Sequence, residues 1–276
     1  MSETTIGFIG LGNQGGPIAH RIVDSGRPLM VWARRPQVLE AYVAKGARAA
    51  ASIAEVGAHC DHVGICVVND ADVADVCRQL IPTMRPGGRI AIHSTVLPET
   101  CIALDKQCAE HGIALIDAPV SGGAAGAQAG TLTVMCGGTQ AVFDACRPVF
   151  ATFGKLIVLA GPPGAGQRAK IINNSLLAAN IALAHAALSA GVTLGLDRDT
   201  LAGLIRGSSG FSFGLEVSAR FASPSAFAGA RLLVKDVGLL QSILPGHAGA
   251  GALHRAAEPY LTEATHGAAG AQTAKL

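Results

Sequence analysis

The 276-residue chain is long enough for one large domain or two smaller ones. Half of its residues are hydrophobic but only 4% are aromatic, so a core built from them must be mainly aliphatic. The formal net charge of +2 and the lack of a basic stripe interleaved with aromatic residues argue against a nucleic-acid partner.

The seven cysteines form no Cys-x-x-Cys pair, which argues against a disulfide framework and against a zinc site. Reduced thiols are typical of a cytoplasmic protein, and the N-terminal sequence MSETTIGFIG lacks the features of a signal peptide.

The longest apolar stretch, residues 175–196, contains Asn180, His185, Ser189 and Thr193. We therefore expect a buried helix there, enclosed within a dimer, and no membrane partner.

The first half of the chain begins with a β-α-β pattern. An apolar strand is predicted over residues 5–10, a helix over 17–26 and a second strand over 28–35. Between the first two lies Gly-x-Gly-x-x-Gly, formed by Gly10, Gly12 and Gly15. In dinucleotide-binding folds the first glycine allows a tight turn, the second lets the backbone approach a pyrophosphate, and the third permits close packing of helix against strand.

The glycine loop is therefore predicted to bind a dinucleotide cofactor. Its intervening residues are Leu11, Asn13 and Gln14. The free N–H groups of the following helix would face the pyrophosphate.

The second strand ends in Ala33, Arg34 and Arg35, without the acidic residue that commonly binds the ribose 2′-hydroxyl of NAD. A guanidinium pairs well with a 2′-phosphate, whereas a carboxylate would repel it. Arg34 and Arg35 therefore favour NADP(H) over NAD(H), unless they are only solvated arginines at a strand end.

Further strands are predicted over residues 62–68, 89–95, 113–123, 131–138 and 155–161. The result is an α/β fold with a doubly wound, Rossmann-type sheet. Ligands bind beyond the carboxyl ends of such strands, where Val68, Asn69, Thr95 and Ser121 fall. Ser121 is followed by Gly122 and Gly123, and this turn either cradles a small anion such as a carboxylate or is only a turn.

After residue 163 the strand pattern stops. We predict a Rossmann domain over residues 1–163 and an all-α domain over 164–276, opened by one long helix from 167 to about 192. Helices are also predicted over residues 199–206 and 232–243, and the Ala/Gly-rich end is expected to fray.

Lys170 and Asn174 lie four residues apart and share one face of the long helix. An ammonium group at this position could give a proton to a substrate oxygen or take one from it, and Asn174 could orient the same oxygen. The alternative is a solvated surface lysine.

Four motifs in this order resemble the β-hydroxyacid dehydrogenases, a family that includes 3-hydroxyisobutyrate dehydrogenase and tartronate semialdehyde reductase. They are GFIGLGNQG (7–15), DAPVSGGAAGAQAGTL (117–132), GAGQRAKIINN (164–174) and Lys-Asp (235–236). The resemblance covers roughly residues 5–243.

The resemblance implies an NAD(P)-dependent oxidoreductase that interconverts a small β-hydroxy acid and its semialdehyde. It implies that Lys170 is the general acid/base, that Asn174 assists at the substrate oxygen, and that the turn beginning at Ser121 holds a substrate carboxylate. It further implies that Thr95, Val68 and Asn69 line the nicotinamide side and that Lys235 reaches the cofactor.

Two alternatives stay open. One is an imine reductase on the same fold, against which Lys170 argues because those enzymes generally carry Asp or Tyr there. The other is a non-catalytic dinucleotide-binding protein. The charge-poor long helix further predicts a homodimer or a dimer-based tetramer.

Overall fold

The computed structural model describes residues 4–221 and 223–272. The chain divides into two compact units, residues 1–170 and 171–276, and each is described by itself. The predicted domain boundary between residues 163 and 164 stays a prediction, since this division falls inside the long helix α8, Ala165–Thr193.

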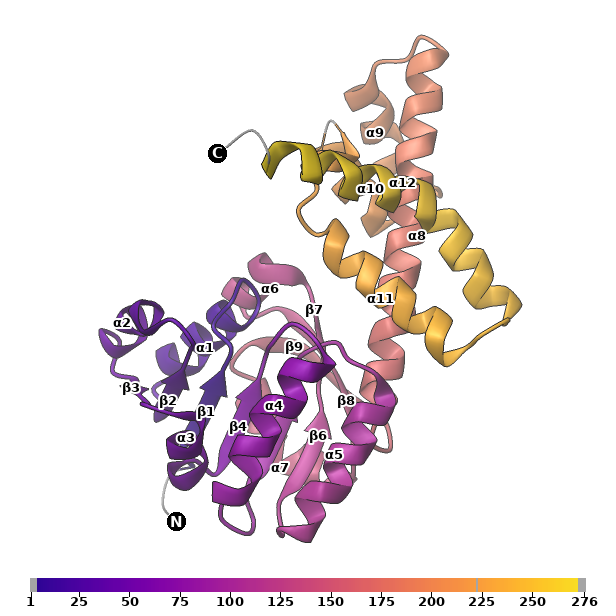
Figure 1. Ribbon diagram of the computed structural model, residues 1–276. Helices are drawn as coiled ribbons and strands as arrows, with labels where there is room; N and C mark the ends of the chain where they lie inside the picture. Colours follow the sequence, from indigo (N-terminus) through magenta and orange to yellow (C-terminus); the bar gives the residue numbers. More distant parts are fainter. Residues whose placement is uncertain (1–3, 222, 273–276) are drawn as a thin grey trace. The chain divides into compact units, whose positions relative to one another are not determined.

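The first unit is built on one nine-stranded sheet, seen in Figure 1. Its strand order is β3-β2-β1-β4-β5-β6-β8-β7, and β9 also pairs with β8. The strands are β1 Ile6–Ile9, β2 Leu29–Trp32, β3 Arg48–Ala49, β4 His62–Ile65, β5 Arg89–Ile92, β6 Ala114–Asp117, β7 Val120–Ser121, β8 Leu132–Gly137 and β9 Gly154–Gly161. From β3 to β6 all pairs are parallel, in the order 3-2-1-4-5-6 of a Rossmann fold.

Helices cover both faces of this sheet. They are α1 Gly15–Asp24, α2 Glu40–Val43, α3 Ile53–His59, α4 Asp70–Leu80, α5 Pro98–Glu110, α6 Gly123–Ala129 and α7 Gln140–Phe150, with short 3-10 turns η1 Pro36–Leu39 and η2 Ile81–Thr83. One core joins the sheet to α1 and α7, through residues such as Ile18 and Phe150. A second core joins it to α3, α4 and α5, through residues such as Val56 and Cys77. The doubly wound fold is confirmed.

The strand predicted over residues 113–123 is wrong in one respect, because the structure breaks it into β6 and β7. Pro119 stands in the break, and proline has no N–H to donate to a strand ladder. The short strand β7 then turns to pair antiparallel with β8. This break places Ser121 on a strand of its own, directly before α6.

The second unit is all helical. After α8 come α9 Arg198–Arg206, α10 Phe213–Arg220, the 3-10 turn η3 Pro224–Ala226, α11 Ala230–Ile243 and α12 Ala248–Gln272. Its main core joins α8, α11 and α12. Helix α12 extends to Gln272, so the C-terminal stretch is helical there; its fraying stays a prediction, and residues 273–276 lie outside the described residues. Ala257, Tyr260, Leu261 and Ala264 explain the helix, since they lie on one face and are buried.

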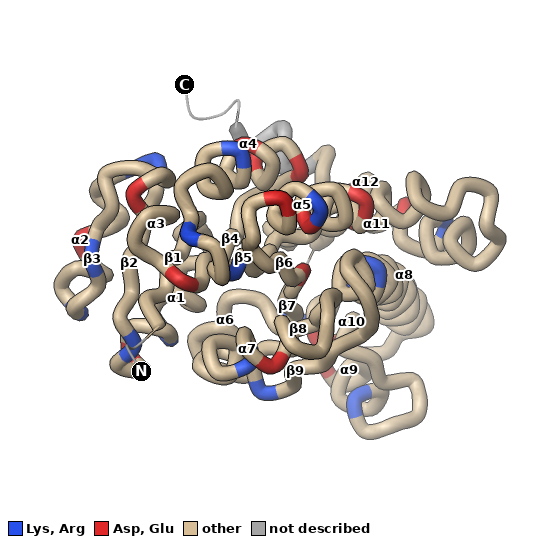
Figure 2. The backbone as a smooth tube through the Cα atoms, turned by 90° about the horizontal axis from the view of Figure 1, so that it is seen from below, with Lys and Arg blue, Asp and Glu red and all other residues tan. Residues whose placement is uncertain are grey.

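In the described part of the chain, α8 alone is long and apolar enough to cross a membrane by length and composition. Its only charged residues are Arg168 and Lys170, and Figure 2 shows it uncharged along most of its length. Several polar side chains of α8 are nevertheless buried by protein, including Gln167, Asn174 and Ser175. This pattern is typical of a helix packed within a globular protein, so the absence of a membrane partner stays our prediction.

Candidate functional site

The glycine loop between β1 and α1 has the close packing that a dinucleotide-binding turn requires. Gly10 adopts φ +98°, and a Cβ there would lie 2.2 Å from the carbonyl oxygen of Cys66. A Cβ on Gly15 would lie 2.0 Å from the carbonyl oxygen of Gly10. Any side chain at either position would force β1, β4 and α1 apart.

The same loop leaves space and donors where a pyrophosphate would lie. A Cβ on Gly12 would meet nothing within 4 Å. Helix α1 has no side-chain cap and no acidic residue in its first turn. Within the described residues, the buried Nε2 of Gln14 has no hydrogen-bond partner. Of the other loop residues, Leu11 is half-buried and Asn13 is exposed. The residues present therefore fit a bound dinucleotide.

Arg34 and Arg35 follow β2 and are both exposed. Arg35 is the N-cap residue of η1, and its carbonyl oxygen accepts a hydrogen bond from Val38 N at 3.2 Å. Over the residues that the structure describes, neither guanidinium group makes a hydrogen bond or an ion pair. Both are thus available to a ligand at the carboxyl end of β2.

Two side chains at predicted strand ends, Ser94 and Asp70, connect the segments that follow β4 and β5. Ser94 Oγ accepts a hydrogen bond from Val67 N at 2.8 Å. Asp70 Oδ1 accepts from Leu97 N at 2.9 Å and from Thr100 Oγ1 at 2.6 Å. These bonds hold the two strand ends side by side.

Among the residues predicted at these strand ends, Val68 is 55% exposed. Asn69 has a clear structural task, because its Oδ1 caps α4 by accepting from Asp72 N at 2.9 Å. Thr95 lies directly between Ser94 and Val96, both of which are buried.

The turn that begins at Ser121 has a backbone that only glycine adopts without strain. Gly122, with φ +129°, is the N-cap of α6, and Gly123 follows with φ +63°. Both values lie where side chains other than glycine are strained. A Cβ on Gly123 would meet nothing within 4 Å, so this turn is open on that side.

Lys170 is buried, with 7% of its surface exposed, in the second turn of α8. The start of this helix is held by two buried residues that the sequence did not single out. Asp117, the last residue of β6, accepts hydrogen bonds from Gly164 N at 2.7 Å and from Gln167 N at 2.8 Å. The Gln167 amide accepts from Val96 N at 3.1 Å and donates to Ser94 O at 2.9 Å.

In the second unit, Asp236 brings together two predicted site residues, Asn174 and Lys235. Asn174 Nδ2 donates to Asp236 Oδ2 at 2.6 Å, and Lys235 Nζ lies 3.3 Å from Asp236 Oδ1. Asn173 Nδ2 in turn donates to Asn174 Oδ1 at 3.1 Å. Asp236 is 3% exposed, so this network fixes which way the Asn174 amide faces.

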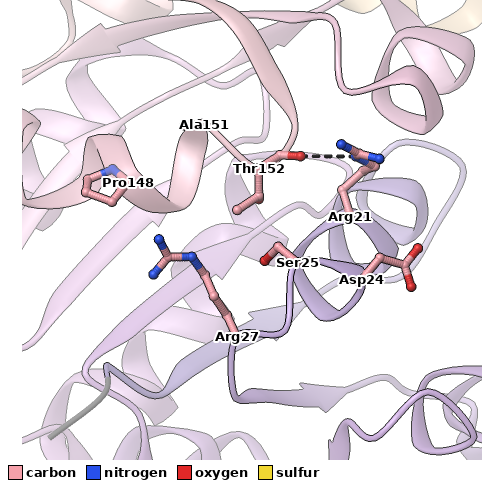
Figure 3. Close-up of a pocket in the computed structure, with 7 residues that line it drawn as sticks. All are labelled: Arg21, Asp24, Ser25, Arg27, Pro148, Ala151 and Thr152. Carbon is pink, nitrogen blue, oxygen red and sulfur yellow. Dashed lines mark hydrogen bonds between the residues drawn. The ribbon is translucent and has the colours of Figure 1, made fainter.

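A separate cavity, shown in Figure 3, is lined by Arg21, Asp24, Ser25, Arg27, Pro148, Ala151 and Thr152. It lies at the C-terminal ends of α1 and α7, where Arg21 Nε donates to Thr152 O at 3.1 Å. A ten-residue helix is about 15 Å long, so the cavity is far from the glycine loop at the other end of α1. It contains none of the predicted site residues.

The cysteine thiol beside the glycine loop is not activated as a nucleophile. The seven cysteines are free, and burial raises the pKa of Cys66, beside the glycine loop, to about 12. Such a thiol is a poor nucleophile. In the part of the chain that the structure describes, no group of three or more His, Cys, Asp or Glu side chains could hold a metal ion.

The chain matches two family profiles. Residues 5–161 match the NAD-binding domain of 6-phosphogluconate dehydrogenase. Residues 164–275 match the NAD-binding domain of NADP-dependent 3-hydroxyisobutyrate dehydrogenase.

Individual relatives agree with these profiles. The 2-(hydroxymethyl)glutarate dehydrogenase of Eubacterium barkeri is 38% identical over 85% of this chain and 80% of its own length. The NAD-dependent L-serine dehydrogenase of Pseudomonas aeruginosa is 37% identical over 86% of this chain and 84% of its own. The structure of Mycobacterium tuberculosis 3-hydroxyisobutyrate dehydrogenase with L-serine superposes with a TM-score of 0.84, at 28% identity, over 97% of this chain and 96% of that one.

Proposed function

Because this chain belongs to the β-hydroxyacid dehydrogenase family, we propose that it interconverts a small β-hydroxy acid and its semialdehyde with Lys170 as general acid/base. The relatives are NAD(P)-dependent oxidoreductases acting on CH–OH groups. They do not favour the imine reductase or the non-catalytic dinucleotide-binding protein.

The observation that carries this proposal is the placement of Lys170. Its side chain is buried, and three residues earlier on the same helix Gln167 is hydrogen-bonded on both sides of Thr95. An ammonium group is rarely buried without a task, because its desolvation is costly. Lys170 is thus held near the carboxyl end of β5, the edge at which ligands bind in such sheets.

Each residue has a task in the proposed reaction. The bound dinucleotide supplies or accepts the hydride. The backbone N–H groups at Gly122 and Gly123, with Ser121 Oγ, hold the substrate carboxylate. Lys170 donates a proton to the carbonyl oxygen during reduction and removes it from the hydroxyl during oxidation. Asn174, one helical turn further on, orients that oxygen through an amide that Asp236 holds in place.

We also propose that NADP(H) is favoured over NAD(H). Support comes from Arg34 and Arg35, two exposed guanidinium groups at the end of β2, where no carboxylate stands. Guanidinium groups bind phosphate in two-pronged geometry. The Pseudomonas relative is named as NAD-dependent, so membership of the family does not by itself decide between the two cofactors.

A homodimer or dimer-based tetramer is proposed on the exposed apolar surface of α8. Ile172, Leu176 and Leu183 are each at least half exposed although they are large aliphatic residues. They recur at helical spacing on one face, as at a buried interface. A cytoplasmic location stays a prediction from the cysteine content.

The experiment follows NADPH and NADH consumption separately with a panel of carboxylate-bearing semialdehydes and a cyclic imine. We expect turnover of a carboxylate-bearing aldehyde, faster with NADPH. Lys170→Ala should lose roughly 10²- to 10⁴-fold in kcat, the usual contribution of general acid–base catalysis, and keep its dinucleotide Kd.

The matched control is Lys106→Ala, which removes an exposed lysine of α5 and should keep wild-type rates. Turnover of imines alone would overturn the proposed substrate class. Full activity in Lys170→Ala would remove the lysine from the mechanism.

A further inference from the structure

The start of helix α8 is held in an unusual way. A helix leaves its first N–H groups unpaired, and a residue just before the helix commonly caps them. Here the acceptor is Asp117, which ends strand β6, and its two carboxylate oxygens bond Gly164 N and Gln167 N across 47 and 50 residues of sequence. The carboxylate is fully buried, so the helix start is attached to the interior of the sheet.

A second attachment comes from the side chain of Gln167. Its Oε1 accepts from Val96 N and its Nε2 donates to Ser94 O, so the amide spans the backbone on both sides of Thr95. Only a group that is donor and acceptor at once can make both bonds. The amide therefore couples the first turn of α8 to the segment that follows β5.

The backbone contacts around these groups leave no space for adjustment. A Cβ on Gly166 would lie 2.3 Å from the carbonyl oxygen of Met135 and 2.8 Å from Asp117 Oδ2. A Cβ on Gly137 would lie 2.5 Å from Asp117 Oδ1. Helix α8 thus begins in direct backbone contact with β8 and β6.

Burying the Asp117 carboxylate costs desolvation free energy, which a solvent-exposed helix cap would avoid. Burial raises the pKa of Asp117 to about 6, and the hydrogen bonds from Gly164 and Gln167 offset only part of that shift. A serine or aspartate at an exposed N-cap would cap the helix without this desolvation. What the buried groups add is a fixed position for the residues that follow, and Lys170 is three residues, or about 4.5 Å along the helix axis, beyond Gln167.

We propose that Asp117 and Gln167 are positioning residues, which fix Lys170 relative to Thr95 at the carboxyl end of β5. This inference rests on the proposed function, in which Lys170 transfers the proton. The two residues touch neither substrate nor cofactor in this scheme and act through the backbone of α8.

The test uses Gln167→Met, which keeps the length of the side chain but removes both hydrogen bonds, and Asp117→Asn, which turns one acceptor oxygen into a donor. We expect kcat to fall roughly tenfold to a hundredfold in either variant, as for a reacting group misplaced by about 1 Å. The dinucleotide Kd should stay within about twofold, because the glycine loop is untouched. Gln140→Met, at an exposed glutamine of α7, is the matched control and should keep wild-type rates.

A second readout does not depend on turnover. Lys170 is modified with pyridoxal phosphate and borohydride, and its labelling rate is measured by peptide mass spectrometry. We expect labelling several-fold faster in Gln167→Met than in the wild type, because a lysine that is 7% exposed would be released. The pH profile of kcat should also shift in the variants, which a general loss of stability would not cause.

Wild-type kcat and wild-type labelling in both variants would overturn the inference. If Gln167→Met does not fold, Asp117→Asn carries the same two measurements. If the wild-type protein turns over no aldehyde, the proposed function fails, whereas the labelling rates still decide whether Asp117 and Gln167 hold Lys170.

Discussion

Among single residues, Arg34 and Arg35 have the clearest separate test, because they lie on the surface and make no described contact that folding needs. We expect Arg34→Asp to weaken NADPH binding by roughly tenfold to a hundredfold, the loss of a hydrogen bond to a charged group. NADH binding should stay unchanged or improve, since a carboxylate can accept from the ribose 2′-hydroxyl.

Fluorescence titration of NADPH and NADH gives both dissociation constants, and Arg35→Asp measured in parallel shows which arginine carries the preference. Arg85→Asp, at another exposed arginine, is the control and should leave both constants unchanged. Equal affinity of the wild type for the two cofactors would contradict the proposed preference.

Two buried histidines make the stability of the first unit depend on pH. His62 is 1% exposed, and burial, followed by electrostatic repulsion from His93, Arg89 and Arg27 when these groups are protonated, lowers its pKa to about 3. Burial likewise lowers the pKa of His93 to about 4, although its Nδ1 hydrogen-bonds Ala118 O at 2.8 Å. Both stay neutral in the folded protein at pH 5, whereas unfolded histidines titrate near 6.5.

The unfolded state therefore binds more protons below pH 6.5, and the free energy of unfolding falls as the pH falls from 6.5 to about 4. Each histidine contributes on the order of 2 kcal/mol between pH 6.5 and pH 5. Asp117 opposes this, because its raised pKa of about 6 lets the folded protein bind a proton that the unfolded one lacks. One carboxyl cannot offset two histidines, so the net effect is destabilisation by acid.

We expect His62→Leu to reduce the loss of stability between pH 7 and pH 5. Neither of its ring nitrogens has a hydrogen-bond partner within the described residues, so leucine leaves no new group unpaired. Urea unfolding followed by Trp32, the only tryptophan, reports on the first unit. His111→Leu, at an exposed histidine, should keep the wild-type pH dependence. The same pH dependence in His62→Leu would contradict this account.

At the level of elements, the sequence predicts those strands and helices whose hydrophobic residues repeat with the period of the element. The apolar runs of β1, β2, β4 and β5 and the length of α8 follow from it, because their side chains repeat with the period of the element. Helices α3, α4, α5 and α7 are not predicted individually, because their buried faces become clear only when they pack against a sheet. Helix α12 is not predicted from the sequence, because its glycines lower the local helix propensity, while packing against α8 and α11 stabilises it.

The residues of the candidate site likewise fall into two groups, those that the sequence predicts and those that only the folded structure reveals. The loop at Gly10 and the helix bearing Lys170 could be predicted, because spacing within a short segment defines them. Asp117 and Gln167 could not, because their partners lie 47 to 73 residues away along the chain. Contacts of that kind depend on which strand ends meet, and only the folded sheet determines this.

At the scale of the whole molecule, the apolar face of α8 predicts self-association. Leu183 is 58% exposed, and Ile172 and Leu176 lie on the same face at 51% and 50%. The helix has no charged residue after Lys170, so nothing on this face opposes a second copy. Burying a leucine side chain contributes about 1.5–3 kcal/mol to the free energy of association. In a symmetric dimer each residue of the interface is buried twice, once in each subunit.

We therefore expect a dimer or a dimer-based tetramer at micromolar concentration, measured by light scattering after size-exclusion chromatography. Leu183→Glu should shift the protein toward the monomer, because a carboxylate would be buried without a partner. Val43→Glu places the same charge at a similarly exposed residue of α2 in the first unit and should leave the mass unchanged. A wild-type protein that is monomeric at micromolar concentration would contradict the proposed assembly, and unchanged mass in Leu183→Glu would move the interface to another surface.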